Sequence, residues 1–266
     1  MNGIDVSNNN NIKDWNILKQ QGVQTVIQKA TQGVDYIDSL FEYRYPKIKQ
    51  AGLKFGVYHF AGGLHTAEQE AEHFVSTIKG KHLDTVCFLD IENYSTKTFS
   101  KVWQYQETID FVNKWFAYVK SKGYKVGLYT GEYFYDSLLK SHIPNIPLWI
   151  ASYDKQPNTY PANSWQYTGT GKLNGALGDL DLDIFTGNIF LKQIKSKDVY
   201  DMKKVVTYLG DADVFAAVVV SQKLGCPLMR KADYEASGLK AEQVIQIGGK
   251  LNSTRWSTFK DAANLI

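Results

Sequence analysis

The sequence has few cysteines and lacks any long apolar segment. Its 266 residues include only two cysteines, Cys87 and Cys226, and both lie among apolar neighbours. We interpret both as buried free thiols, so no disulfide framework is expected. The first residues, MNGIDVS, contain neither a charged leader nor an apolar signal region. No stretch approaches the roughly 20 apolar residues of a membrane-spanning helix, so we expect no membrane partner.

The sequence also lacks the residues that several common kinds of catalytic or binding site require. The five histidines show no metal-ligand spacing, and Gly62-Gly63 is not followed by the Lys-Ser/Thr pair of a phosphate-binding loop. The net charge is only +3: residues 1–194 carry 19 basic and 19 acidic side chains, and the remainder carries 11 and 8. Without a basic run, this excess favours an anionic partner for the C-terminal part but not nucleic acid. We therefore predict no metal ion, no cofactor and no nucleic-acid partner.

Short apolar runs alternate with segments of helical period through the first part of the chain. Helical segments at 14–21, 42–51, 67–78 and 103–122 lie between the earlier runs, and glycine follows several of them. This alternation indicates βαβ units and a parallel sheet. The runs predict eight strands, at 3–6, 23–30, 54–60, 85–92, 125–131, 147–153, 164–167 and 179–185. We predict an α/β fold at residues 1–191, an irregular TIM-like barrel of five βα units plus three strands, with its chemistry at the carboxyl ends of the strands.

The remaining residues predict a small α/β domain at 203–266, joined to the barrel by a polar linker at 192–202. Strands are expected at 204–209, 226–230 and 244–247, and helices at 211–224 and 256–265. About 65 residues make a small core with open sheet edges, so we expect this domain to pack on a second copy or on the barrel. Met202 is interpreted as an ordinary linker methionine, with internal initiation as the alternative.

Two carboxylates end the fourth predicted strand. Asp90 and Glu92 are two residues apart, so they share a face with Phe88, while Leu89 and Ile91 face the covering helices. Carboxyls held close together raise one another's pKa, which keeps one of them protonated for donation to a leaving oxygen. The alternative is a pair of acids that caps the next helix or binds a cation.

Further acids stand on the first and last predicted strands. Asp5 ends the first strand, and Asp179, Asp181 and Asp183 share one face of the last. Because these strands are neighbours in a closed barrel, Asp5 and one of the three can meet the fourth-strand pair at the barrel mouth. The chain also has 17 Tyr, 13 Phe and 6 Trp, whose rings suit the C–H faces of sugars. For any single ring, core packing is the alternative.

Eight short motifs occur in order through nearly all of residues 1–190. They are GIDVS at 3–7, QKATQG at 28–33, GVYHF at 56–60, FLDIEN at 88–93, GLYTG at 127–131, LWIASY at 148–153, WQYTG at 165–169 and DLDIF at 181–185. Together they resemble the glycoside hydrolase family 25 lysozymes, or Chalaropsis-type muramidases. The resemblance implies the same irregular barrel and cleavage of the β-1,4 bond between N-acetylmuramic acid and N-acetylglucosamine in bacterial peptidoglycan.

The same motifs imply residue roles. Glu92 looks like the proton donor and Asp90 like its companion, while Asp5 and Asp181 are similar to the other two acids of the family's cleft. The sugar-contacting aromatics would be Tyr58, Phe60, Tyr129 and Trp149. One departure is Gln32, which stands where the family usually has Glu in its KATEG segment.

The C-terminal residues resemble one copy of the clostridial cell-wall-binding repeat type 2. The matching segments are DADVFAAVVVSQKLGCPL at 211–228, VIQIGGK at 244–250 and TRWSTFKDAANLI at 254–266. That family usually carries three copies that pack together, so a homo-oligomer through this domain is a hypothesis, with a wall glycopolymer as a second ligand beside peptidoglycan. The combination resembles a phage endolysin, made in the host cytoplasm without a signal peptide and acting on the cell wall after release.

Two other functions stay open. One is a different barrel glycosidase such as a chitinase, whose motif also ends in Asp-x-Glu. The other is a non-catalytic protein that binds cell-wall glycan through a decayed site. A wall amidase would need a set of zinc ligands, which the sequence lacks.

Overall fold

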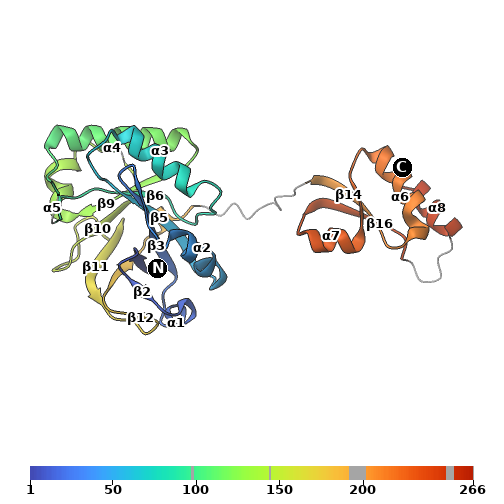
Figure 1. Cartoon of the computed structure of the whole chain (residues 1–266), viewed down its shortest axis with the longest axis horizontal. Helices are drawn as coiled ribbons and strands as arrows, with labels where there is room; N and C mark the ends of the chain where they lie inside the picture. Colours follow the sequence, from blue (N-terminus) through green and yellow to red (C-terminus); the bar gives the residue numbers. More distant parts are fainter. Residues whose placement is uncertain (97–98, 144, 192–201, 250–254, 266) are drawn as a thin grey trace. The chain divides into compact units, whose positions relative to one another are not determined.

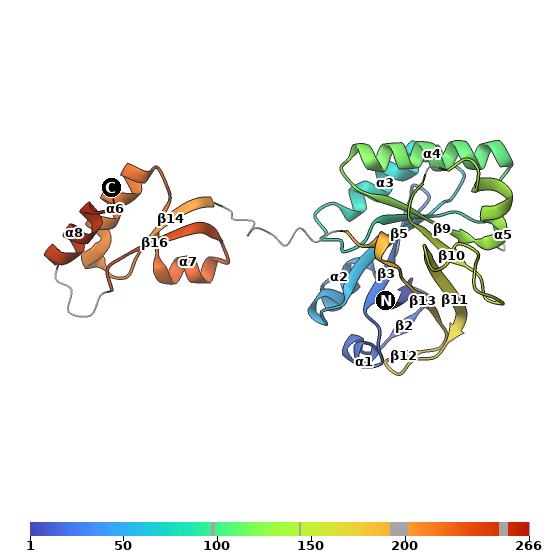
Figure 2. The ribbon, with the colours of Figure 1, turned by 180° about the vertical axis from the view of Figure 1, so that it is seen from behind.

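The chain forms two compact units, Met1–Lys192 and Gln193–Ile266, drawn in Figure 1 and, from behind, in Figure 2. The computed structural model describes residues 1–96, 99–143, 145–191, 202–249 and 255–265. The predicted linker at 192–202 lies outside these residues except for Met202, which begins the first strand of the second unit. None of the described helices is long and apolar enough to cross a membrane.

The first unit is a closed barrel of eight strands, as the apolar runs predicted. The strands are β1 (Asn2–Val6), β3 (Thr25–Gln32), β5 (Lys54–Phe60), β6 (Cys87–Asp90), β9 (Val126–Gly131), β10 (Leu148–Ala151), β11 (Ser164–Gly171) and β13 (Leu180–Ile184). Strand β1 pairs with β3 on one side and with β13 on the other, and these pairings close the barrel. The unit also has five shorter strands: β2 (Asn11–Ile12), β4 (Tyr36–Ile37), β7 (Tyr94–Ser95), β8 (Ser100–Lys101) and β12 (Ala176–Leu177).

One feature of the barrel differs from the predicted parallel sheet. Strand β13 runs antiparallel to both of its neighbours, β1 and β11. Its beginning, rather than its end, therefore lies beside the carboxyl end of β1. This reversal brings Asp181, near the start of β13, directly opposite Asp5 in the register of the two strands.

Helices cover the outside of the barrel. They are α1 (Trp15–Gln20), α2 (Phe41–Gln50), α3 (Ala67–Ile78), α4 (Tyr105–Ser121), α5 (Glu132–Phe134) and the π-helical turn η1 (Tyr135–Leu139), and the 3₁₀ turn η2 (Gly187–Ile189) follows β13. Thr66 and Gln69 form a reciprocal capping box that fixes where α3 begins. Gly52, with a φ of +70°, ends the turn after α2 in the left-handed region that glycine adopts without strain. Helices α3 and α4 pack side by side against the barrel, as Figure 2 shows.

The barrel has two apolar cores. The outer one, between strands and helices, includes Leu89 and Ile91 from the β6 segment. The inner one fills the barrel with Ile27, Tyr58, Val86, Phe88, Tyr129, Trp149, Phe185 and Ile189. The predicted alternation along β6 is therefore confirmed, since Phe88 points inward and its neighbours point outward.

The second unit has a three-stranded parallel sheet in the order β15-β14-β16. Its elements are β14 (Met202–Tyr208), η3 (Asp211–Asp213), α6 (Val214–Leu224), β15 (Leu228–Arg230), α7 (Lys231–Ser237), β16 (Ala241–Ile247) and α8 (Arg255–Ala263). Helix α6 packs with α8 on one face and α7 lies on the other (Figure 1). The three predicted strands and two predicted helices are confirmed. Helix α7 was missed, and Cys226 is partly exposed rather than buried.

Candidate active site

The carboxyl end of β6 places two acids at the barrel mouth. Asp90 is the last residue of the strand and is flanked in the sheet by Phe60 of β5 and Tyr129 of β9. It is buried, and Glu92, two residues further on, is half-buried. Atom Oδ1 of Asp90 has no hydrogen-bond partner among the described residues. This pair therefore lies at the edge of the inner core, and one of its carboxyl oxygens is buried without a hydrogen bond from the described residues.

The first and last strands bring three more acids to the same place. Asp5 and Asp181 face each other across the β1–β13 pairing. Asp183, two residues along β13, is also buried, and its Oδ1 accepts a hydrogen bond of 2.8 Å from Nε1 of Trp149. Asp179, by contrast, is exposed and pairs with Lys172 at 2.5 Å. Of the three aspartates on the predicted face, Asp181 and Asp183 thus belong to the cluster and Asp179 does not.

Burial and mutual repulsion raise the pKa of every acid in this cluster. For Asp5, Asp90 and Asp183, loss of solvation is the largest cause of a pKa well above the ordinary value. The pKa of Glu92 is also raised, first by burial, and burial raises that of Asp181 to about 6. Carboxyls in such a site hold protons at a pH where free ones have lost them. The site can therefore contain an acid and a carboxylate at once.

Gln166 on β11 joins the acids to the aromatic side chains, and the sequence did not single it out. Its Nε2 donates to Oδ2 of Asp5 at 2.7 Å. Its Oε1 accepts from the hydroxyls of Tyr129 at 2.9 Å and Tyr153 at 2.7 Å. The WQYTG motif contains this glutamine, and its position two residues from Ser164 on a buried strand face was the available signal.

The four predicted aromatics lie around the acids at different depths. Phe60 is half-buried at the mouth, in edge contact with Tyr94. Tyr58 and Tyr129 are each 9% exposed, and Trp149 is only 1% exposed beneath them. Trp149 donates its hydrogen bond to Asp183 from this buried position. It is therefore better placed to position the acid cluster than to stack on a sugar ring. Tyr153, which the sequence did not predict, is more accessible.

A cavity of about 520 Å³ opens beside Glu92. Its other walls come from helix α5, which follows β9, and from the loop after β10; they include Glu132, Tyr133, Tyr153 and Lys155. Glu132 links the helix to this loop, because its carboxylate accepts from Oγ of Ser152 at 3.1 Å and from the backbone N–H of Asn158 at 2.9 Å. The cavity has the size and mixed lining of a small-molecule or oligosaccharide subsite.

The arrangement defines a class of protein. The carboxyl end of this βα barrel has acids with raised pKa values, aromatic rings and an adjoining cavity. These features are typical of a glycoside hydrolase, which cleaves its substrate with a pair of carboxyl groups. Among the described residues, no group of three or more His, Cys, Asp or Glu side chains is placed to hold a metal ion.

Comparison with known proteins assigns the family. The family model for glycosyl hydrolases family 25 matches residues 4–176, and the chain belongs to this family. It is 36% identical over 193 residues to an autolytic lysozyme of Clostridium acetobutylicum, covering 72% of this chain and 57% of that relative's length. It is 28% identical over 199 residues to lysozyme M1 of Streptomyces globisporus, covering 70% of this chain and 68% of that protein.

Solved structures agree with the family. A family 25 glycosyl hydrolase from Bacillus anthracis is 27% identical, with a TM-score of 0.63 over 71% of this chain and 89% of that chain. The CTP1L endolysin, whose activity is regulated by a secondary translation product, is 28% identical with a TM-score of 0.58. That similarity covers 99% of this chain and 97% of the endolysin, so it includes the C-terminal unit.

Proposed function

We propose that this protein is an endolysin-type lysozyme that hydrolyses the β-1,4 bond between N-acetylmuramic acid and N-acetylglucosamine in bacterial peptidoglycan. The observation that carries the proposal is the acid pair of buried Asp90 and half-buried Glu92, with Glu92 bordering a cavity of about 520 Å³. Burying several carboxyls costs free energy, and pKa values perturbed in this way cluster at functional sites. The names of the lysozyme relatives support the same activity.

In this mechanism Glu92 is the general acid. It borders the cavity, and its raised pKa keeps a proton available for the departing glycosidic oxygen. Such proton donation contributes roughly 10²–10⁴-fold in rate. Asp90 and Asp181 stabilise the positive charge that develops on the sugar ring or position its N-acetyl group. Asp5, held by Gln166, orients water or its neighbours.

Product analysis tests the activity and separates it from the other glycosidase and binding functions. Purified peptidoglycan is digested, reduced with borohydride and sized by mass spectrometry. We expect products that end in muramitol, as cleavage after N-acetylmuramic acid requires. Ends in N-acetylglucosaminitol would show a different glycosidase, and the absence of new reducing ends would leave a non-catalytic wall-binding protein.

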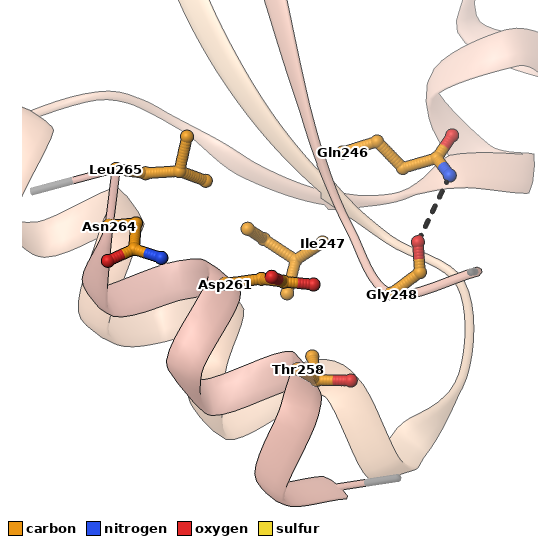
Figure 3. A pocket seen from close by; sticks show the side chains of 7 residues that line it. All are labelled: Gln246, Ile247, Gly248, Thr258, Asp261, Asn264 and Leu265. Atoms are coloured by element: carbon orange, nitrogen blue, oxygen red, sulfur yellow. Dashed lines mark hydrogen bonds between the residues drawn. The ribbon is translucent and has the colours of Figure 1, made fainter. Parts of the chain in front are cut away.

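We also propose that residues 203–266 target the enzyme to the wall by binding a glycopolymer. The C-terminal unit has a cavity of about 340 Å³ between the end of β16 and helix α8 (Figure 3). Polar side chains of Gln246, Thr258, Asp261 and Asn264 line it, together with the apolar Ile247 and Leu265. Amide, hydroxyl and carboxylate groups beside an apolar surface suit the hydroxyls and C–H faces of a sugar.

Sedimentation with cell walls tests this role without lysis. Full-length Glu92→Gln protein is mixed with purified walls, and we expect it to pellet with them. Asn264→Ala weakens pelleting, whereas the control Glu235→Ala, on α7 at the other face of the sheet, leaves it unchanged. Walls stripped of phosphodiester-linked glycopolymer by hydrofluoric acid bind less. Equal binding to stripped walls would place the ligand in peptidoglycan itself.

Self-association through the C-terminal unit remains part of the proposal. Phe215 and Val219 are one turn apart on α6 and are 73% and 48% exposed, so they place two adjacent apolar side chains at the surface of the unit. A polypeptide that starts at Met202 would contain all of β14, β15 and β16. A full-length chain could therefore pair with such a product. Analytical ultracentrifugation of wild-type and Met202→Leu preparations tests both ideas, because a single monomeric species in both would exclude them.

A further inference from the structure

Lys29 is a cation at the barrel mouth that the mechanism above does not use. It lies on β3 opposite Tyr58 of β5. Its Nζ lies 4.7 Å from the ring centre of Phe60 and 5.7 Å from that of Tyr36. Within the described part of the chain, no carboxylate comes within 4.0 Å of it. Instead, Nζ donates to the neutral Oε1 of Gln32 at 2.7 Å.

The acid pair needs a nearby positive charge. Oδ1 of Asp90 is buried and has no hydrogen-bond partner among the described residues, so hydrogen bonding to this oxygen does not stabilise the ionised form. The neighbouring acids disfavour ionisation further. Lys29 acts in the other direction. Its Nζ lies 4.7 Å from the ring centre of Phe60, the residue beside Asp90 in the sheet, and its charge lowers the pKa of both Asp90 and Glu92. In return, these carboxylates favour the charged form of Lys29 against its burial.

We propose that Lys29 is the counter-charge that sets the pH range in which the Asp90–Glu92 pair works, and that Gln32 holds Lys29 without neutralising it. A carboxylate at position 32 would form an ion pair with Nζ and cancel most of its field at the acids. The amide fixes the side chain equally well and leaves the charge available. This inference rests on the proposed lysozyme function and gives Gln32 a specific role in it.

Other charged and titratable groups face this region from every neighbouring strand. They are Asp5 on β1, Tyr36 and Asp38 at β4, Tyr58 on β5, Tyr129 on β9 and Asp181 on β13, with His59 on the outer face of β5. Among these acids, Asp181 raises the pKa of both members of the pair. Within the described residues around the pair, Lys29 is therefore the positive charge that opposes this effect.

The pH dependence of kcat/KM on purified peptidoglycan tests the proposal. A bell-shaped profile has an acid limb for the group that must be ionised and a basic limb for the group that must be protonated. Gln32→Glu adds a negative charge beside Lys29, and Lys29→Met removes the positive one. Both changes raise both pKa values, so we expect both limbs to move to higher pH by on the order of one pH unit.

Two conservative variants separate charge from structure. Gln32→Met removes the hydrogen bond without adding charge, and Lys29→Arg keeps the charge. We expect their limbs to stay near the wild-type positions even where kcat falls. If Gln32→Met moves the limbs as far as Gln32→Glu, or if neither Gln32→Glu nor Lys29→Met moves them, the proposal is wrong.

An independent titration keeps this test apart from the lysozyme assignment. Carboxyl ¹³C signals of Asp and Glu are followed by NMR in the unliganded full-length protein. The Asp90 and Glu92 signals are assigned by their absence in Asp90→Asn and Glu92→Gln, and we expect both titrations to move to higher pH in Gln32→Glu. That result would stand even if wild-type protein released no muramitol-ended products, which would reject the proposed function alone. Unchanged carboxyl titrations in Gln32→Glu would reject the role of Lys29.

Discussion

Nε2 of Gln166 donates a 2.7 Å hydrogen bond to Oδ2 of Asp5, although the two residues are 161 positions apart in the chain. The other end of the same amide accepts from two tyrosines, Tyr129 and Tyr153. One neutral side chain therefore fixes an acid of the first strand to the aromatic wall of the cleft. Because both ends of the amide are hydrogen-bonded, its orientation is determined.

Replacing this amide should impair catalysis more than folding. Gln166→Leu is similar in volume but leaves Asp5 and both tyrosine hydroxyls without their partner. We expect kcat/KM to fall about 10²-fold, as small displacements of catalytic groups do. The matched control is Gln106→Leu on the exposed face of α4. Activity of Gln166→Leu within twofold of wild type would show that Asp5 does not need this bond.

The raised pKa of Asp181 gives a prediction about stability. Burial raises that pKa to about 6 from an ordinary 3.8. Because the folded state binds this proton more tightly than the unfolded chain, the carboxylate costs stability above about pH 6 and nothing below about pH 4. We expect Asp181→Asn to melt several degrees higher than wild type at neutral pH, with the difference vanishing in acid. Calorimetry that found Asp181→Asn less stable at neutral pH would contradict this. The control is Asp110→Asn, at an exposed position on α4.

A buried network fixes the loop that follows β5. The Glu70 carboxylate accepts from the backbone N–H groups of Gly62 at 2.8 Å and Gly63 at 2.9 Å, and from Nε2 of His59 at 2.9 Å. Burial lowers the pKa of His59, so the neutral ring donates from Nε2 and accepts at Nδ1 from Thr31.

Glu70→Gln replaces one accepting oxygen with an NH₂ group, which faces the N–H donors of Gly62, Gly63 and His59 and cannot accept from them. We expect this change to lower the free energy of unfolding by about 3 kcal/mol. Urea denaturation measures the loss, with exposed Glu68→Gln as the control. A loss no larger than that of the control would mean that the network does not stabilise the loop.

The GIDVS motif begins with a glycine for a steric reason. A Cβ at Gly3 would lie 2.2 Å from the Phe185 ring and 2.9 Å from the carbonyl oxygen of Thr25. We expect Gly3→Ala to cost about 1–3 kcal/mol of stability through overpacking. Gly187→Ala, where nothing lies within 4 Å of the added carbon, should be neutral. Equal thermal stability of the two variants would show that the strand can shift to make room.

The fold followed from the sequence where the hydrophobic pattern was strong. Apolar runs predicted all eight barrel strands. A strand of a parallel sheet is buried on both faces, so its sequence is a nearly continuous apolar run. The antiparallel direction of β13 was not predicted. Alternation shows which face a side chain takes but not which way the strand runs. The short connection from β11 to β13 decides the direction, since a parallel crossover needs a dozen or more residues.

The site was predictable only in part. Alternating acids on β13 and after β6 gave the candidates, although the choice of Asp181 left out the equally clustered Asp183. Gln166 and Lys29 stand inside the WQYTG and QKATQG motifs, but their roles were not predicted, because only the tertiary structure shows their partners. Helix α7 is short and polar, so its pattern does not differ from that of a loop.

The central claim is that Glu92 delivers the proton to the leaving oxygen. It is tested most directly by comparing Glu92→Gln with wild type on two substrates, peptidoglycan and a muramyl oligosaccharide with a 4-methylumbelliferyl leaving group. The aryl oxygen leaves without protonation, so it does not need the acid. We expect Glu92→Gln to lose at least about 10²-fold on peptidoglycan and much less on the aryl substrate. Equal losses on both, or near-normal lysis of peptidoglycan, would contradict the assignment.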